Sequence, residues 1–294
     1  MVSRIIKDTT FVIGYWEVKN NKKRSFEHYL KYLPKTFKLL KNCKIVFFYS
    51  DEKILKFVKK HLRTKDFEAI KINVSDLPTY EISKDYLKSC KKQDNTIFKN
   101  SLSKLKITYN LLYLKSGSQT YRELFTIWTS KLFLVEKVIK KNPFHTSNFA
   151  WVDASISRVN RRFRWNFTKQ KFSKKVIYHY RGEELVFNEQ LKLIAGFLLG
   201  KKEIFLKLIK LFKKQLEESK DSNFAMDEEV LLHFVHKNNE KLFYNIQNVT
   251  GLQRIIFLKF KEFRKFMELK RDSKSILWKK VIKLKDFLFK IFFA

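Results

Sequence analysis

The chain has 294 residues, 45% of them hydrophobic and 16% aromatic, so it can bury a large core in one or two domains. With 6 Gly and 3 Pro, long disordered linkers are not expected. Its 63 Lys and Arg against 29 Asp and Glu give a net charge of +34. That charge predicts an anionic partner, such as nucleic acid, a membrane face or phosphorylated small molecules, unless it reflects the codon bias of an AT-rich genome.

Cysteine content and hydropathy indicate the cellular compartment in which the protein is expected. Cys43 and Cys90 are the only cysteines, which suits a reducing environment and gives no disulfide framework. Residues 1–7 do not read as a signal peptide, because charges interrupt them and no apolar stretch follows. No run of about 18 apolar residues predicts a transmembrane helix. We therefore expect a cytoplasmic protein.

The first third of the chain alternates between strand and helix patterns. Strands are predicted over residues 10–14, 44–49 and 68–74, and helices over residues 25–40 and 52–62. Ser25 and Ser50 are the candidate N-caps of the two helices. Pro34 predicts a kink or an early break in the first one. The alternation predicts an α/β fold with a mixed, mainly parallel sheet flanked by helices.

The middle of the chain continues this pattern after a polar stretch, 77–117, that we expect to be helical in part. Helices are predicted over residues 125–140, 202–218 and 227–236, strands over residues 149–152 and 176–180, and an apolar segment over residues 191–199. Gly196 and Gly200 in that apolar segment predict a close approach of another part of the chain.

The most informative segment is Phe149-Ala-Trp-Val-Asp-Ala-Ser-Ile-Ser-Arg158. It reads as a buried strand that ends on one carboxylate, Asp153, followed by the small residues Ala154 and Ser155. A carboxylate at the carboxyl end of a strand is where α/β folds bind substrates and metals. It is equally a residue that caps turns. Both interpretations stay open from this segment alone.

Residues 251–294 differ in character from the rest. They hold 13 Lys and Arg against 4 Asp and Glu. One helical stripe is apolar (Leu277, Val281, Leu284, Leu288, Ile291), and the opposite face carries Lys279, Lys280, Lys283 and Lys290. This pattern predicts a basic amphipathic helix lying on an anionic membrane. An ordinary C-terminal helix that packs on the core is the alternative.

Four ordered blocks resemble the WlaTC/HtrL (YibB-like) family, bacterial proteins associated with surface-polysaccharide and lipopolysaccharide loci and expected to be glycosyltransferases. The blocks span 11–16 with 24–30, 128–131 with 142–144, 149–158, and 194–197 with 227–231 and 242–243. The resemblance covers roughly residues 8–247. It departs at Ser155, where the family commonly has Gly.

The resemblance implies a GT-A-like, Rossmann-type glycosyltransferase domain over residues 1–250. Its nucleotide-binding half would cover about 1–158 and its acceptor half about 159–250, with 251–294 as a helical basic extension. It also implies a nucleotide-sugar donor, expected to be a UDP-sugar. The acceptor would be a surface glycan or lipid-linked saccharide, such as lipooligosaccharide, O-antigen or capsule.

The same resemblance points to a donor site. Gly14, Tyr15 and Trp16 leave the first strand where such folds seat the nucleotide, and Tyr15 is placed to stack on the base. Arg24 could pair with phosphate. Lys131 lies near the start of the helix predicted over residues 125–140. The alternatives are core packing for the aromatics and a solvated surface position for Lys131.

Sugar transfer also needs a neutralised leaving diphosphate and, in most cases, a base for the acceptor hydroxyl. Asp153, with the Ser155 hydroxyl, is the candidate ligand of a divalent cation, Mn²⁺ or Mg²⁺. Metal-free catalysis by Lys and Arg is the alternative. Asp227 or Glu228, at the start of a helix, is the candidate general base. The remaining candidates are three histidines that could serve as ligands: His179, His233 and His236.

The leading hypothesis is therefore a glycosyltransferase, peripheral on the inner face of the cytoplasmic membrane, whose sugar and whose retaining or inverting course the sequence does not specify. A nucleic-acid-binding protein is the second hypothesis and explains the charge at once. It lacks a helix-turn-helix, zinc-finger or RNP signature. A membrane-peripheral protein with the same fold and no catalysis is the third, because Asp153-Ala-Ser155 has a single carboxylate.

Overall fold

The computed structural model describes residues 4–21, 25–91, 117–161, 175–180, 185–186, 189–220 and 227–246. Ile246, the last residue of these ranges, also ends the first of the two compact units into which the chain divides. The predictions for Arg24 and for the basic tail, 251–294, lie outside the described residues.

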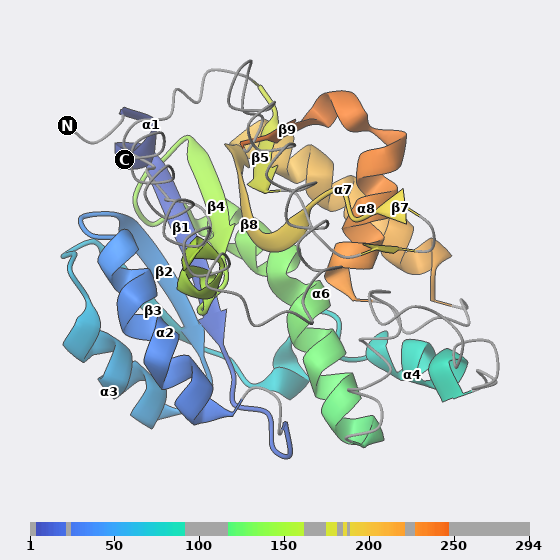
Figure 1. Cartoon of the computed structure of the whole chain (residues 1–294). Helices are drawn as coiled ribbons and strands as arrows, with labels where there is room; N and C mark the ends of the chain where they lie inside the picture. The colour runs from blue at the N-terminus through green and yellow to red at the C-terminus, as the bar shows by residue number, and fades with distance from the viewer. Residues whose placement is uncertain are drawn as a thin grey trace, which may run out of the picture. The chain divides into compact units, whose positions relative to one another are not determined.

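A seven-stranded sheet forms the centre of the described fold, in the order β3-β2-β1-β4-β8-β5-β9 (Figure 1). Its strands are β1 (Thr9–Tyr15), β2 (Lys44–Tyr49), β3 (Phe67–Lys71), β4 (Asn148–Val152), β5 (Ile177–Tyr180), β8 (Ile194–Lys201) and β9 (Phe243–Asn245). The first four strands are parallel, β8 is antiparallel to β4 and β5, and β9 is parallel to β5. The predicted α/β fold with a mixed, mainly parallel sheet is confirmed.

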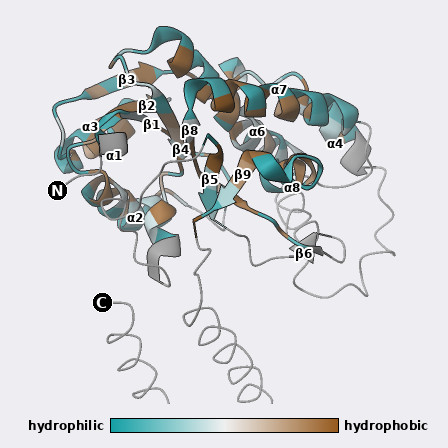
Figure 2. Cartoon of the chain, turned by 90° about the horizontal axis from the view of Figure 1, so that it is seen from above, coloured by the Kyte–Doolittle hydropathy of each residue, from teal (hydrophilic) through white to brown (hydrophobic). Residues whose placement is uncertain are grey.

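Helices cover both faces of the sheet. On one face lie α2 (Phe26–Leu39) and α3 (Glu52–His61); on the other lie α6 (Ser118–Lys141), α7 (Lys202–Glu218) and α8 (Glu228–Asn238) (Figure 1). Because successive strand residues point to opposite faces, β1 sends Phe11 and Ile13 into one core and Val12 into the other. All three side chains are 0% exposed. In Figure 2, α7 shows hydrophobic and hydrophilic residues along its length, as an amphipathic helix should.

The remaining elements are short. They are α1 (Arg4–Lys7), α4 (Ser83–Lys91), the 3-10 helices η1 (Val74–Asp76), η2 (Ile156–Arg161) and η3 (Glu240–Leu242), and a separate two-stranded pair of β6 (Leu185–Val186) with β7 (Glu189–Gln190). None of the helices in the described ranges is long and apolar enough to cross a membrane.

Four local predictions differ from the structure. The N-cap of α3 is Asp51 and not Ser50, because the Asp51 carboxylate accepts a hydrogen bond from the Lys53 N–H at 2.8 Å. Of the two outcomes expected at Pro34, the early break does not occur, because α2 continues to Leu39 and buries Leu33 and Phe37 on either side of the proline. Packing of that face outweighs the hydrogen bond that the proline cannot donate.

The third of these differences concerns α6. This helix begins at Ser118, seven residues before the predicted start, so Lys131 lies in its middle and not near its beginning. The segment before residue 125 contains Thr120, Tyr121 and Leu124, all buried, which extend the apolar face beyond the part that the hydrophobic periodicity indicated. The predicted third strand also ends early, at Lys71, and Val74 opens η1.

Candidate functional site

The order of the strands indicates where a ligand is expected to bind, at the carboxyl ends of two central strands. From β1 the chain moves outward through β2 to β3, then returns to β4 on the opposite side of β1. Between β1 and β4 the winding direction therefore reverses. In open α/β sheets ligands bind at such a switch point, beyond the carboxyl ends of the strands. Tyr15 ends β1, and Asp153 directly follows β4.

Asp153 is held firmly at this position. Its N–H donates to the Gly196 carbonyl at 2.8 Å, which continues the pairing of β4 with β8. Its Oδ1 atom accepts from Trp151 Nε1 at 2.8 Å and from Lys131 Nζ at 2.8 Å. A Cβ atom at Gly196 would stand 3.2 Å from Asp153 Oδ2, so the glycine makes room for the carboxylate. The Asp153 side chain is still 27% exposed and can be reached from outside.

Lys131 connects Asp153 to α8. Its Nζ atom lies 2.5 Å from Glu228 Oε1 as well as 2.8 Å from Asp153 Oδ1. The ammonium also lies 5.9 Å from the centre of the Trp151 ring. The side chains of Lys131 and Glu228 are each only 8% exposed. One buried ammonium is thus shared by two carboxylates from two different elements.

This sharing changes the pKa values of both buried groups, Lys131 and Glu228. Burial raises the pKa of Glu228 to about 7; Lys131 opposes the shift, while Asp227, Glu229 and Asp153 add to it. Burial by itself would lower the pKa of Lys131, but Asp153 and Glu228 together raise it above its usual value. The ammonium can neutralise one carboxylate. Glu228, the more buried of the two, therefore keeps a proton up to near neutral pH.

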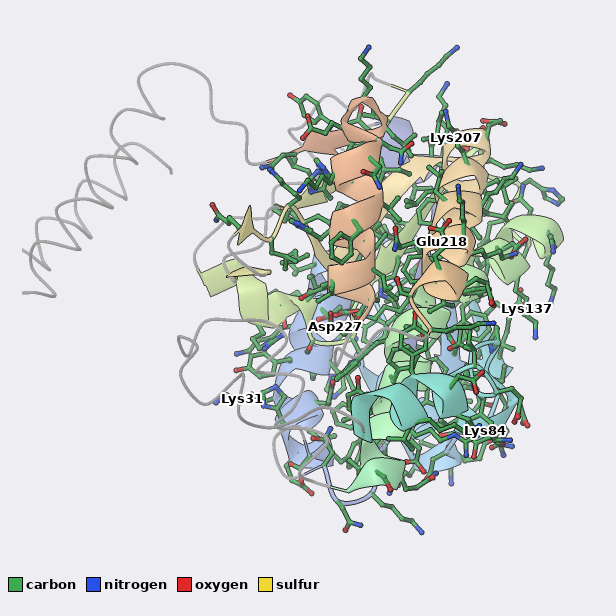
Figure 3. The ribbon with its side chains drawn as sticks, turned by 90° about the vertical axis from the view of Figure 1, so that its right-hand side faces the viewer. Lys31, Lys84, Lys137, Lys207, Glu218 and Asp227 are labelled. Atoms are coloured by element: carbon green, nitrogen blue, oxygen red, sulfur yellow. The ribbon has the colours of Figure 1, made fainter. Side chains whose placement is uncertain are left out.

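The three consecutive acids at the start of α8 have separate partners. Asp227 is the N-cap, with its Oδ1 accepting from the Val230 N–H at 3.0 Å. Glu228 pairs with Lys131, and Glu229 Oε1 accepts from the Ala195 N–H of β8 at 3.2 Å. Figure 3 shows Asp227 at one end of α8, which runs alongside α7. The predicted general bases, Asp227 and Glu228, are both buried, so their catalytic role stays a prediction that their exposure does not support.

The end of β1 is packed with aromatic side chains. Tyr15 and Trp16 are each 4% exposed. The Tyr15 ring lies 4.4 Å from that of Tyr29, and Trp16 Nε1 donates to the Ile72 carbonyl at 2.9 Å. A Cβ atom at Gly14 would stand 2.4 Å from the Trp16 ring, so this glycine is needed for packing. Contact of these residues with a nucleotide stays a prediction, and Tyr15 would have to leave its present packing to make it.

The other predicted residues are placed as follows. Ser155 is buried, at 3% exposure. His233 Nδ1 accepts from the Lys192 N–H at 3.3 Å. His179 and His236 lie with ring centres 5.3 Å apart, and His236 stacks on Phe243 at 4.6 Å. Within the described ranges, no three His, Cys, Asp or Glu side chains come together as a metal site.

The predicted divalent cation at Asp153 does not fit this geometry. The Oδ1 atom already accepts from an ammonium and an indole N–H, both at 2.8 Å. A Mn²⁺ or Mg²⁺ ion would need its carboxylate oxygens at roughly 2.0–2.2 Å, and Lys131 would be its immediate neighbour. At Oδ1 the metal ion would compete with the ammonium for one oxygen, and at Oδ2 of the same carboxylate it would still be repelled by the nearby ammonium charge. Ser155, the expected second ligand, is buried.

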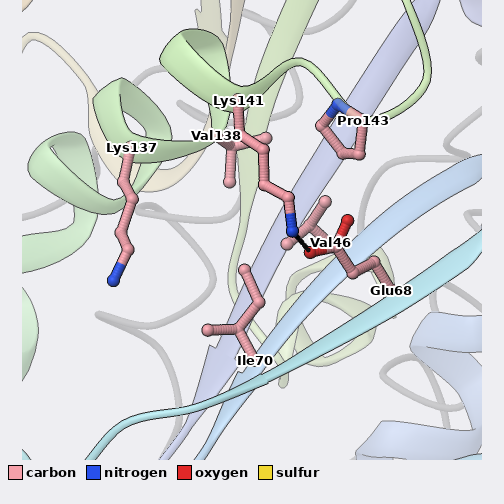
Figure 4. Close-up of a pocket in the computed structure, with 7 residues that line it drawn as sticks. All are labelled: Val46, Glu68, Ile70, Lys137, Val138, Lys141 and Pro143. Carbon is pink, nitrogen blue, oxygen red and sulfur yellow. Dashed lines mark hydrogen bonds and ion pairs between the residues drawn. The ribbon is translucent and has the colours of Figure 1, made fainter.

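A cavity of about 210 Å³ lies elsewhere, between the end of α6 and the outer strands β2 and β3 (Figure 4). It is lined by Val46, Glu68, Ile70, Lys137, Val138, Lys141 and Pro143. Lys141 pairs with Glu68 across it at 2.5 Å. Pro143 leads from α6 into the start of β4, whereas Asp153 follows the end of that strand. The cavity therefore lies away from Asp153, toward the amino-terminal end of β4.

Some of this site was accessible to sequence reasoning and some was not. Gly196 was predicted to mark a close approach, which is confirmed, although Asp153 as the approaching group was not foreseen. Trp151 and Glu229 were not predicted to contribute. A signal for Lys131 was present, because it lies seven residues after Leu124 and four before Val135, on the buried stripe of α6. A lysine on such a stripe requires a buried partner.

Fold and site together define an α/β protein with a charged cluster at a topological switch point. The chain belongs to the family described as "Bacterial protein of unknown function (HtrL_YibB)", which matches residues 7–265. The resemblance to that family is confirmed. The match runs past residue 247, where we expected it to end, into the first part of the predicted tail.

Two solved structures show a weak overall likeness to the chain. One is "a glycosyltransferase involved in the glycosylation of the major capsid of PBCV-1", with a TM-score of 0.35, 11% identity, and coverage of 81% of this chain and 80% of that one. The other is core-mannan synthase A (CmsA/Ktr4) from Aspergillus fumigatus in its Mn/GDP form, with a TM-score of 0.40, 9% identity, and coverage of 83% and 74%. Likeness of this degree assigns no function. No curated protein matches the chain.

Proposed function

We propose that this protein is a glycosyltransferase that moves a sugar from a nucleotide-sugar donor, a UDP-sugar by the resemblance, to a surface-glycan or lipid-linked saccharide acceptor. The observation that carries the proposal is the Asp153 carboxylate, exposed at the switch point between β1 and β4 and fixed from behind by Lys131 and Trp151. The residues behind Asp153 thus hold its carboxylate in one orientation while a quarter of its side chain stays open to the outside. Such support from behind is what a carboxylate that binds substrate needs.

The chemistry expected of Asp153 follows from what sugar transfer requires. The acceptor oxygen forms a bond to the anomeric carbon while the bond from that carbon to the diphosphate breaks. Positive charge develops on the sugar ring in between, and a fixed anion beside the ring stabilises it. Asp153 can also accept a hydrogen bond from a sugar hydroxyl. Lys131 and Glu228 are too buried to touch the sugar, so they act as positioning residues.

The test uses the full-length chain and a panel of UDP-, GDP-, ADP- and CMP-sugars. At least one donor should raise the melting temperature, and the release of its nucleotide should depend on the protein. Asp153→Asn should lower this turnover at least about 100-fold, the range for loss of a charged catalytic group. Glu136→Gln is the matched control, because it removes a part-buried carboxylate on α6 that is likewise paired with a lysine, Lys213 at 2.9 Å, but lies away from the switch point.

Two results would contradict the proposal. One is a panel in which no nucleotide sugar shifts the melting temperature while DNA binds with a steep salt dependence, which would favour the nucleic-acid hypothesis. The other is an Asp153→Asn variant that is folded and fully active. A protein that binds a nucleotide sugar without turnover would match the third hypothesis, a binding protein without catalysis.

We also propose that the basic tail, 251–294, holds the protein on the inner face of the cytoplasmic membrane. The support is the sequence pattern, in which lysines oppose an apolar stripe. Replacing Lys279, Lys280 and Lys283 with Glu should weaken binding to phosphatidylglycerol vesicles about 100-fold or more, since each basic residue near such a surface contributes about 1 kcal/mol.

The matched control for the tail lies on the exposed face of α7. Replacing Lys207, Lys210 and Lys214 with Glu changes the net charge by the same amount. This variant should keep most of the affinity for the vesicles, as measured by cosedimentation. Equal losses in the two variants would mean that only the overall charge matters and that the tail has no special role.

A further inference from the structure

The charged cluster behind Asp153 has the composition of a small cation site that already contains its cation. Two carboxylate oxygens, Asp153 Oδ1 and Glu228 Oε1, converge on one point from β4 and α8, at 2.8 and 2.5 Å. Convergent carboxylates from separate elements are the usual means of holding a divalent ion. Here the point of convergence is Lys131 Nζ, supplied by a third element, α6.

Lys131 cannot easily leave this position. Its side chain is 8% exposed, and its neighbours in α6, Ser130 and Leu132, are also buried. Removal of the ammonium from between the buried Glu228 and the part-buried Asp153 would leave both carboxylates without a counter-charge. A divalent ion arriving from solvent would therefore have to displace a covalently attached cation, or bind beside it against its charge.

The other nearby acids offer no replacement site. Asp227 accepts from the Val230 N–H, and Glu229 accepts from the Ala195 N–H of β8. Both carboxylates are thereby engaged in fixing α8 to its place. In the part of the chain that the structure describes, no further His, Cys, Asp or Glu joins Asp153 and Glu228 to make a third ligand.

We propose that the Lys131 ammonium takes the place of a divalent cation at Asp153, so that this site binds its nucleotide donor without Mn²⁺ or Mg²⁺ coordinated by Asp153. The inference rests on the proposed function for the identity of the ligand, whereas the ammonium between the two carboxylates is a feature of this chain alone. Charge on the leaving diphosphate is then neutralised by basic side chains.

The geometry has a consequence that can be measured without any substrate. In Lys131→Ala, Asp153 Oδ1 and Glu228 Oε1 face each other across the vacated position of the ammonium. In the wild type these two oxygens lie 2.8 and 2.5 Å from Lys131 Nζ. Carboxylate oxygens bind Mn²⁺ at somewhat shorter distances, so a small inward shift of the two side chains would suit the ion. At alkaline pH, where both carboxylates are ionised, substitution of the lysine should therefore create a Mn²⁺ site of these two oxygens and water at the position that the ammonium occupies in the wild type.

The experiment is a titration of Mn²⁺ alone into the full-length protein, with the free ion followed by electron paramagnetic resonance and the melting temperature recorded in parallel. Wild type and Asp153→Asn should give the same titration. Lys131→Ala should melt lower than wild type, bind one additional Mn²⁺ ion per chain and regain part of its lost melting temperature. Lys131→Ala combined with Asp153→Asn should bind no additional ion.

The inference is overturned if wild-type protein binds a Mn²⁺ ion that Asp153→Asn abolishes. This comparison needs only proteins that retain Lys131, so it decides the question even if Lys131→Ala does not fold. A second measurement separates the inference from the proposed function. A nucleotide sugar that stabilises the protein equally in EDTA and in Mn²⁺ supports both, stabilisation only in Mn²⁺ overturns the inference, and no stabilisation in either condition counts against the proposed function.

Discussion

The ends of β1 and β4 are neighbours in the sheet, yet they are built in opposite ways. β1 ends on Tyr15 and Trp16, two aromatic side chains at 4% exposure each. β4 ends on Asp153, whose carboxylate is 27% exposed and backed by a buried ammonium. Of these two strand ends at one switch point, only that of β4 presents a polar group to the outside. A residue at a strand end is therefore accessible to a ligand only where its side chain stays outside the core.

The two strand ends are nevertheless connected. A Cβ atom at Gly14 would stand 2.4 Å from the Trp16 ring and 3.3 Å from the Trp151 ring. Trp151 in turn donates the hydrogen bond that orients Asp153. The two strand ends therefore both pack close to Gly14, and substitutions at the two ends should still differ in kind.

The largest effect on stability is expected from Lys131→Met. It keeps most of the side-chain volume but removes the ammonium from between Asp153 and Glu228, which should lower the free energy of unfolding by about 3–5 kcal/mol at pH 8. Urea-induced unfolding measures this. Glu228→Gln is the comparison, because it leaves Lys131 paired with Asp153 and should cost much less. Equal losses in the two variants would contradict the shared ammonium.

A pH dependence of about 3 kcal/mol is expected from Glu228. Its pKa is about 7 in the folded protein against an ordinary value of 4.5. The folded state therefore binds more protons than the unfolded state between these values. Its contribution to stability is full below pH 4.5 and is lost as the pH rises to about 7, at about 1.4 kcal/mol per unit.

The contribution of Glu228 is measured as the difference in unfolding free energy between two proteins. The free energy of unfolding of the wild type minus that of Glu228→Gln should fall between pH 4.5 and 7 and then level off. Subtraction removes the contributions of other titrating groups that the substitution leaves unchanged. A flat difference would mean that Glu228 is ionised throughout and that the ammonium neutralises both carboxylates.

A smaller effect is expected at the end of β1. Gly14→Ala should lower the free energy of unfolding by about 1–3 kcal/mol, because the added methyl group overlaps the buried Trp16 ring. Gly196→Ala meets only Ile156 and the Asp153 carboxylate, at 3.1 and 3.2 Å, and should change stability less but turnover more. The reverse order of the two variants in either measurement would remove the distinction between the two strand ends.

Much of the fold followed from local pattern. The helix over 202–218 and the strand over 44–49 have the bounds that periodicity predicts, because each presents a continuous amphipathic or apolar face to a core. The boundaries that failed depend on single contacts. Asp51 replaces Ser50 as N-cap through one hydrogen bond, and Pro34 is retained in α2 by packing of its neighbours. Hydrophobic periodicity carries no information about either.

The alternation of strands and helices and the position of Asp153 at a strand end could be predicted from residues close together in the chain, and the family from the order of short blocks along it. The tertiary structure decided which residues share the site. Lys131, Asp153 and Glu228 come from three elements spread over 97 positions, and no local pattern relates them. Their meeting depends on the order of strands in the sheet and on the desolvation of an ammonium, which only a folded core imposes.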